Sequence, residues 1–166
     1  GNMDSLQSTR VIPASRELEH VRCYLNLERI RFGAHLRVEY AIETSDFFLP
    51  ALSLQPLVEN AIFHGIEPKG SAGEVTLRVE RDTANGDVLI HLTDDGVGMT
   101  EEQARQLLSE NKNEKTEFFR EIGVSNVHKR LQYEFGEDYG LRVESRLSEF
   151  TTVSVLLPLA PQEDIG

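Results

Sequence analysis

The stretch EVTLRVERDTANGDVLIHLTDDGVGMT, residues 74–100, decides the fold. Apolar side chains fall at every second position in two runs, Val75, Leu77, Val79 and then Val88, Ile90, Leu92. This period predicts two half-buried strands. Asn85-Gly86 lies between the runs and predicts a hairpin turn. The stretch therefore predicts an antiparallel pair of strands that ends in the sequence TDDGVGM.

Two carboxylates and two glycines gather in TDDGVGM, residues 93–99. A tight turn explains them, because Gly tolerates positive φ and Asp is common in turns. The alternative is a backbone that approaches a ligand closely, beside a carboxylate that reads the ligand. Taken alone, the glycine pattern leaves both interpretations open.

The flanking segments predict helices and strands in alternation. Helical spacing recurs in four segments: 15–32, 53–65, 100–108 and 123–135. Alternating apolar residues recur in three more: 35–42, 140–146 and 150–159. Because strands joined by short turns pair antiparallel and leave one face for helices, we expect an α/β fold.

Helix ends are predicted from capping chemistry. Ser53 can cap the second helix, Thr100 and Gln103 fit a capping box for the third, and Gly65 and Gly136 can end helices. In the first helix, Glu17 and Glu19 favour the positive end of the helix dipole. The charged stretch 109–122 has no apolar period, so we expect a mobile loop there.

Composition excludes several classes of protein. The 166 residues are 39% apolar and carry a formal net charge of −11, which indicates a folded domain and argues against nucleic-acid binding. Backbone amides and a metal ion can still hold a small phosphate ligand. The single cysteine, Cys23, fits a reducing compartment. No apolar run is long enough to span a membrane, so we expect no direct membrane contact.

The sequence VENAIFHG, residues 58–65, places polar groups on an apolar helix. Asn60 is either a hydrogen-bonded structural amide or an oxygen ligand for Mg²⁺, which prefers hard oxygen donors. Glu59 could then hold a metal-linked water or act as a base. His64 follows one turn later and could meet a ligand, although a lone histidine is usually structural.

The sequence EIGVSNV, residues 121–127, suggests a further site. Gly123 stands at the expected start of a helix after the loop. Helix N-termini bind phosphates through free amides and the positive dipole end. An ordinary junction, with Gly for clearance, is the alternative.

Taken in order, the three motifs resemble the ATP-binding domain shared by gyrase, the ninety-kilodalton heat-shock chaperones, sensor histidine kinases and the MutL repair proteins. The resemblance covers about residues 35–158 and implies a Bergerat-type ATP-binding fold. In this fold, a two-layer α/β sandwich, helices cover one face of a mixed, mostly antiparallel sheet. Three stretches, LSLQPLVENAIFHGI, GVSNVHKRL and ELEHVRCYLNLERIRFG, resemble sensor histidine kinases of the LytS type. The chain is then expected to comprise a flexible leader (1–14), a linker helix (15–33), the ATP domain (34–160) and a tail (161–166).

The resemblance implies roles for the glycine turn and for the asparagine helix. Asp94 accepts a hydrogen bond from the adenine amino group, and Gly96 and Gly98 let the chain pass under the nucleotide. Asn60 holds Mg²⁺ on the ATP phosphates, with Glu59 beside it as a second catalytic residue. Asp95 occupies the free position of the motif and is expected to face solvent or anchor a water.

The resemblance also implies a lid over ATP. Residues 109–122 form this lid, and Gly123 begins the helix that meets the phosphates. Val124, Asn126 and His64 complete the expected nucleotide-binding set.

Two departures from the family pattern put nucleotide affinity in question. Family members often carry Lys at the position of Phe63 and Gly at the position of Glu121. A degenerate nucleotide-binding domain that acts as a protein-interaction module is therefore the alternative function. An ATPase of the gyrase or chaperone class fits less well, because that class places its general-base Glu where this chain has Pro56.

The resemblance implies partners that lie outside this chain. No segment matches the acceptor-histidine motif of the group, and His20 lies in the linker helix. We therefore expect the catalytic fragment of a homodimeric kinase, with the acceptor histidine on a dimerisation domain of the same full-length protein. A response regulator would be its partner. The domain is expected in the cytoplasm, as part of an inner-membrane sensor.

Overall fold

The computed structural model describes residues 10–109 and 114–159, and the side chains of residues 114–122 fall outside this description. Five strands form the main sheet in the order β2 (Leu36–Ile42), β4 (Gly73–Asp82), β5 (Asp87–Asp94), β7 (Phe150–Pro158) and β6 (Gly140–Arg146). β2 pairs with β4 in parallel, and the other three pairings are antiparallel. The mixed, mostly antiparallel sheet is therefore confirmed.

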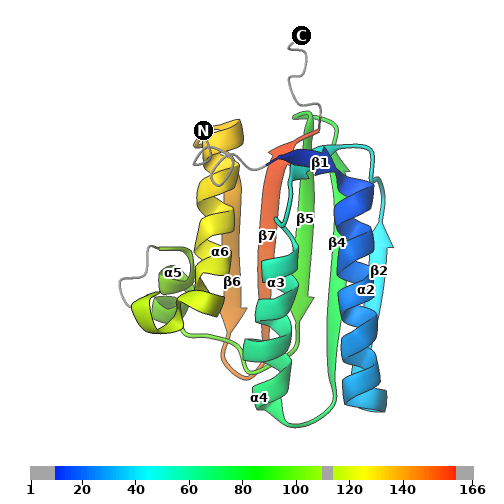
Figure 1. Cartoon of the computed structure of the whole chain (residues 1–166), viewed down its shortest axis with the longest axis vertical. Coiled ribbons are helices and arrows are strands. Elements are labelled where there is room, and N and C mark those ends of the chain that lie inside the picture. Colours follow the sequence, from blue (N-terminus) through cyan, green and yellow to red (C-terminus); the bar gives the residue numbers. More distant parts are fainter. Residues whose placement is uncertain (1–9, 110–113, 160–166) are drawn as a thin grey trace.

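Helices cover one face of this sheet (Figure 1). They are α2 (Ala14–Phe32), α3 (Gln55–Asn60) and α6 (Glu114–Phe135), and α5 (Glu101–Leu108) lies beside β6. A 3-10 turn, η1 (Gly33–His35), joins α2 to β2. α3 continues without a break into the π-helix η2 (Ala61–Ile66) and then α4 (Glu67–Lys69). The arrangement confirms the two-layer α/β sandwich.

The core lies between the sheet and the three covering helices. Every second residue of the central strands is buried, including Val75, Leu77, Val79, Val88, Ile90, Leu92, Val153, Val155 and Leu157. The helices contribute buried residues such as Leu18, Val21, Leu25, Leu57, Ile62, Val127 and Leu131. Each fully buried aliphatic side chain of this kind contributes roughly 1.5–3 kcal/mol. The period-two pattern of residues 74–94 therefore marks the core side of the sheet.

A second sheet of two short strands joins the segment before α2 to the segment before α3. β1 (Val11–Pro13) pairs antiparallel with β3 (Phe48–Pro50), with Ile12 opposite Leu49. Both of these facing residues are buried. Three-residue strands are too short to show a period, and β1 lies inside the segment that we expected to be a flexible leader.

Two helix boundaries predicted from glycines are wrong. α6 begins at Glu114, so Gly123 lies inside the helix and not at its start. The charged stretch lacks an apolar period, but Glu and Lys favour helix in their own right. Gly65 does not end its helix either, since helical structure continues to Lys69 and Gly70 ends it in the left-handed conformation. The expected lid residues 110–113 lie outside the described part of the chain.

The predicted Ser53 cap is also wrong, because the N-cap residue of α3 is Leu54 and its side chain makes no capping hydrogen bond. Three other predictions are confirmed. Thr100 and Gln103 form a complete capping box on α5. Gly136, with φ of 111°, follows the last residue of α6. The turn that contains Asn85-Gly86 joins β4 to β5 as a hairpin.

Polar cross-strand pairs lie on the face of the sheet opposite the helices. The imidazole of His91 lies between Ser154 and Glu80, at 2.8 Å from the Ser154 hydroxyl and 3.0 Å from the Glu80 carboxylate. The Thr93 and Thr152 hydroxyls are 2.8 Å apart. These cross-strand pairs join β4, β5 and β7 on the side that no helix covers.

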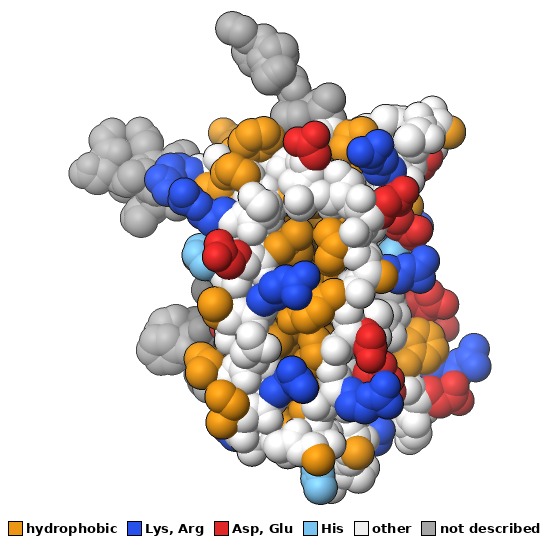
Figure 2. Space-filling view, turned by 90° about the vertical axis from the view of Figure 1, so that its right-hand side faces the viewer, with side chains coloured by type: hydrophobic (Ala, Val, Ile, Leu, Met, Phe, Trp, Pro, Cys, Tyr) orange, Lys and Arg blue, Asp and Glu red, His pale blue; other side chains and the backbone are white. Residues whose placement is uncertain are grey.

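The side of the molecule formed by α2 and β2 shows an apolar strip crossed by basic side chains (Figure 2). On this side, the guanidinium of Arg22 on α2 lies 4.1 Å from the centre of the Tyr40 ring on β2. Neither α2 nor any other helix within residues 10–109 and 114–159 is long and apolar enough to cross a membrane.

Candidate functional site

A pocket of about 270 Å³ opens where η2, the end of β5, α5 and β7 meet. Four of the residues expected from the sequence line it: Asn60, His64, Asp94 and Gly98. Gly65, Val97, Met99, Gln103, Leu107 and Thr151 complete the lining. The asparagine helix and the glycine turn are therefore brought together in one pocket.

The turn after β5 packs directly on the helix that carries Asn60. The Val97 N–H donates to the Gly65 carbonyl at 3.1 Å. A Cβ on Gly96 would collide with that same carbonyl group, and a Cβ on Gly65 would collide with the Asp94 carboxylate. Gly96 is thus needed for contact between two backbone segments. Gly98 borders the pocket and has a φ of 73°.

Asp94 is the buried carboxylate of the pocket. It is 3% exposed, and its Oδ1 accepts a hydrogen bond from the Gly96 N–H at 2.9 Å. Burial raises the pKa of Asp94 to about 6, and the nearby charge of Asp95 also raises it, while the Gly96 N–H and Lys69 oppose the shift. Burial removes the water that would otherwise donate hydrogen bonds to this carboxylate. The carboxylate is therefore a strong acceptor for the amino group of a ligand.

Asp95 holds the backbone beside the pocket and does not line it. Its Oδ1 accepts from the Glu74 N–H at 2.8 Å and lies 3.6 Å from the Lys69 ammonium. The carboxylate is 47% exposed. The expectation that it faces solvent is met in part, and its contact with Glu74 ties the turn to the start of β4.

The π-helix η2 shapes the other wall of the pocket. π-helical segments are rare and occur mostly at functional sites. Asn60 is the last residue of α3, directly before η2, and His64 and Gly65 lie within η2. The wider π turn therefore lies where the helix contacts the glycine turn.

Asn60 fits a Mg²⁺ ligand. Asn60 lines the pocket, and within the described part of the chain its side chain makes no hydrogen bond. No group of three acidic, histidine or cysteine side chains that could hold a metal exists among the described residues. A Mg²⁺ ion at Asn60 would therefore draw its other ligands from phosphates and water, as this ion commonly does.

Glu59 lies beside Asn60 but does not line the pocket. Its carboxylate accepts a hydrogen bond from the Gln55 side chain at 3.2 Å. Phe63, at the position where the family often carries Lys, is 41% exposed on η2. The catalytic role expected for Glu59 stays a prediction.

The residues expected at the phosphates do not line this pocket. Gly123 packs on α3, where an added Cβ would lie 2.9 Å from Cβ of Pro56. Val124 is buried in the core and Asn126 is exposed. Gly123 therefore has a packing role, and nucleotide contacts by Val124 and Asn126 stay predictions. The Glu121 side chain lies outside the described residues.

Sequence reasoning missed Thr151 at the site. Thr151 lies opposite Asp94 in the pairing of β5 with β7, is buried and borders the pocket. Its hydroxyl is 2.7 Å from that of Ser145. A polar residue at an inward position of an otherwise apolar alternation was the available signal.

This chain is similar to known proteins over most of its length. Residues 50–161 match the model of the family described as histidine kinase-, DNA gyrase B-, and HSP90-like ATPase. The uncharacterized protein YwpD of Bacillus subtilis is 37% identical over 93% of this chain and 53% of its own length. The sensor histidine kinase BtsS of Escherichia coli K12 is 34% identical over 86% of this chain and 23% of its own length. The sensor protein LytS of Bacillus cereus is 34% identical over 93% and 26%.

Solved structures share the fold. The catalytic domain of the histidine kinase ThkA has a TM-score of 0.67 at 14% identity, over 93% of this chain and 98% of that one. The histidine kinase domain of the blue-light activated kinase EL346 of Erythrobacter litoralis has a TM-score of 0.64 at 22% identity, over 93% and 64%. The present chain spans about half of YwpD and about a quarter of the two sensor proteins.

Proposed function

Because the chain belongs to the histidine kinase-, DNA gyrase B- and HSP90-like ATPase family, we propose that it positions Mg-ATP as the catalytic domain of a two-component sensor histidine kinase. The observation that carries this proposal is the meeting of two groups in one pocket. Asp94 supplies a buried carboxylate, and Asn60 supplies a side-chain amide that lines the same pocket. The first suits the amino group of adenine and the second suits a phosphate-bound metal.

In this proposal, one group of pocket residues binds the adenine base and another lies at the phosphates. Asp94 accepts from the adenine amino group, with the Thr151 hydroxyl beside it, and Gly98 leaves room for the base. Asn60 would supply its amide oxygen to the metal at the phosphates, and His64 lines the same pocket. Mg²⁺, when bound, neutralises phosphate charge during a transfer that depends mainly on alignment and electrostatics.

The acceptor histidine and the response regulator belong to the rest of the system. Transfer would go to a histidine on the dimerisation domain of the same full-length protein, a homodimer, and then to the regulator. Two observations support this: the chain spans only part of its sensor relatives, and ThkA has been solved in complex with the response regulator TrrA. The domain would act on the cytoplasmic side of an inner-membrane sensor.

One observation favours the second candidate function. Phe63 is exposed on η2, where a lysine could otherwise reach phosphate. A domain that has lost ATP binding and acts as an interaction module would carry such a change. Titration with ATP separates the two functions.

The first prediction concerns nucleotide binding in the presence and absence of Mg²⁺. By calorimetry, Asp94→Asn should weaken ATP binding about tenfold or more both with Mg²⁺ and with EDTA, since its amide N–H₂ opposes the adenine amino group. Asn60→Ala should remove the gain that Mg²⁺ gives and leave binding in EDTA nearly unchanged.

Asp95→Asn is the matched control, because Asp95 lies in the same turn but outside the pocket lining. It should bind like the parent. A parent protein that binds neither ATP nor ADP at millimolar concentration would instead support the interaction module.

A further inference from the structure

The start of α3 has no cap from its own sequence. Its N-cap residue is Leu54, whose side chain offers no acceptor. Ser53, which we expected to be the cap, donates its hydroxyl to the Pro50 carbonyl at 2.6 Å. The first N–H groups of a helix need acceptors when they are buried. Here the acceptor comes from a different helix.

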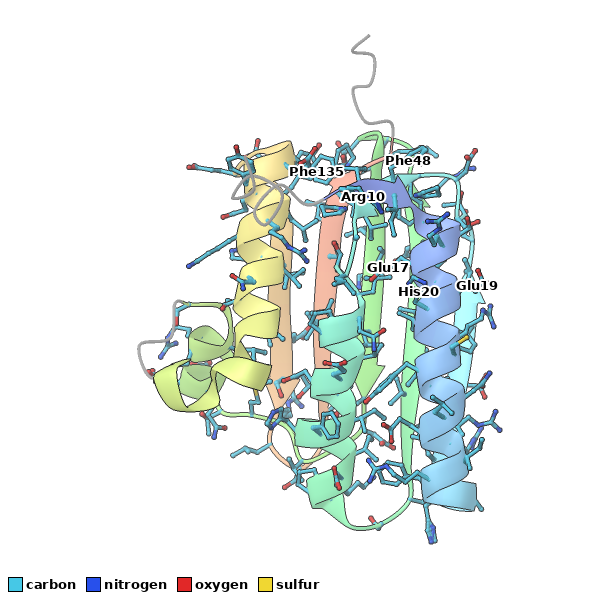
Figure 3. All side chains as sticks on the ribbon, viewed as in Figure 1. Arg10, Glu17, Glu19, His20, Phe48 and Phe135 are labelled. Atoms are coloured by element: carbon cyan, nitrogen blue, oxygen red, sulfur yellow. The ribbon has the colours of Figure 1, made fainter. Side chains whose placement is uncertain are left out.

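Glu17 of α2 is that acceptor. It is completely buried, with 0% of its surface exposed. Oε1 accepts from the Leu52 N–H at 3.0 Å, and Oε2 accepts from the N–H groups of Leu54 and Gln55 at 2.9 and 3.3 Å. Figure 3 shows Glu17 on the side of α2 that faces α3, with Glu19 on the opposite side. Three donors and the positive helix end compensate for burying this carboxylate.

Arg130 of α6 donates hydrogen bonds to the backbone carbonyl groups of the same segment. Nη1 donates to the Ala51 carbonyl at 2.9 Å, and Nη2 donates to the Leu52 carbonyl at 2.8 Å. Burial lowers the pKa of Arg130, and the nearby negative charge of Glu17 opposes that shift. Leu52 has a φ of 63°, a conformation that a side chain of this size rarely adopts. Residues 51–55 are thus fixed from two sides, by α2 and by α6.

The fixed segment leads directly to the metal ligand. Asn60 lies six residues after Leu54, about 9 Å along a rigid helix. The Gln55 backbone is held by Glu17, and the Gln55 side chain in turn donates to Glu59, the neighbour of Asn60. A displacement at the start of α3 therefore displaces the pocket end of α3.

We propose that Glu17, together with Arg130, is a positioning residue for the nucleotide site: by fixing residues 51–55 it sets where Asn60 meets the metal on the phosphates. This inference rests on the proposed function. It makes α2 part of the scaffold of the site, although no residue of α2 lines the pocket.

The second prediction tests this with Glu17→Gln, which keeps the shape but turns an N–H₂ group toward backbone donors. We measure ATP affinity by calorimetry with Mg²⁺ and with EDTA. The gain in affinity from Mg²⁺ should fall about tenfold, while affinity in EDTA should change by less than about twofold. Loss of stability alone would not alter this ratio in the folded protein.

Glu28→Gln is the matched control. Glu28 is also largely buried on α2, but it pairs with Arg31 at 2.8 Å and makes no hydrogen bond or ion pair with residues 51–55. This variant should leave the Mg²⁺ gain unchanged. If Glu17→Gln does not fold, Arg130→Lys takes its place, since an ammonium cannot contact both carbonyls as the guanidinium does.

A second readout keeps this test separate from that of the proposed function. In nucleotide-free protein, the Asn60 side-chain amide resonance should shift in Glu17→Gln and not in Glu28→Gln, whether or not the parent binds ATP. An unchanged Asn60 resonance or an unchanged Mg²⁺ gain, with only the unfolding free energy lowered, would overturn the positioning role and leave Glu17 as a helix cap.

Discussion

Asp94 combines deep burial with a single hydrogen-bond donor from its own turn. The Gly96 N–H is that donor, and Asp95 adds a second negative charge nearby. The pKa of Asp94 is therefore about 6 in the folded protein, above its ordinary value of 3.8. A ligand that donates to this carboxylate replaces hydrogen bonds that burial takes from it.

The third prediction follows from the sign of this shift. Because the folded pKa lies above the unfolded one, the contribution of Asp94 to stability is fully present below about pH 3.8 and is lost as the pH rises through about 6. Relative to Asp94→Asn, the parent should lose on the order of 1 kcal/mol of unfolding free energy between pH 5 and pH 8. Urea unfolding at both pH values measures the difference.

The asparagine variant serves as the internal reference, since it cannot titrate at this position. Parent and variant curves that stay parallel from pH 5 to pH 8 would show that Asp94 is more hydrated than its 3% exposure suggests.

Residues of the site could be predicted where their signal is local in the sequence. Asp94 and Gly98 follow an alternating run, and Asn60 interrupts an apolar helix face, so each stands out without a partner. Thr151 and Glu17 could not be found in this way. Glu17 was interpreted as a favourable charge for its own helix, whereas its partner Leu52 is 35 residues away along the chain.

At the scale of elements, α3 and α6 approach each other through the smallest side chain. Gly123 lies in α6 against Pro56 in the first turn of α3, and an added Cβ would be 2.9 Å from the proline ring. The ring is rigid and the proline is fixed in place by its helix. This close contact explains a glycine in the interior of a helix, where it costs about 1 kcal/mol relative to alanine.

The fourth prediction is that Gly123→Val lowers the free energy of unfolding by about 2 kcal/mol, because overpacking outweighs the gain in helix propensity. Tyr133→Val is the control, since Tyr133 is exposed on the same helix, and it should change stability by less than about 0.5 kcal/mol. Urea unfolding without nucleotide measures both. A Gly123→Val variant as stable as the parent would mean that α3 and α6 can move apart freely.

Elements with a strong period were predicted correctly, and those that depend on tertiary contacts were not. The alternation of apolar residues predicts β4 and β5, and the capping box of Thr100 predicts the start of α5. β1 and β3 have three residues each, and only their mutual pairing makes them strands. The helical residues 114–122 show no amphipathic period, so pattern reasoning placed a loop there.

At the scale of the whole molecule, the fifth prediction is that this chain does not phosphorylate itself on histidine. The sequence has five histidines, and none lies in a segment that resembles the acceptor motif of the LytS group. Incubation with γ-labelled ATP and Mg²⁺ should leave no acid-labile label on the chain. Label on His20, which is exposed on α2, would contradict the assignment of the acceptor to another domain.

The two outer strands of the sheet also limit how far the sheet can grow. β2 and β6 each have one edge without a strand partner in the five-stranded order. Exposed charged residues alternate along both of them: Arg37 and Glu39 on β2, and Arg142, Glu144 and Arg146 on β6. A strand that paired with either edge would have to bring its own side chains against these charges. Charged borders therefore protect the molecule from fibril-like, edge-to-edge aggregation.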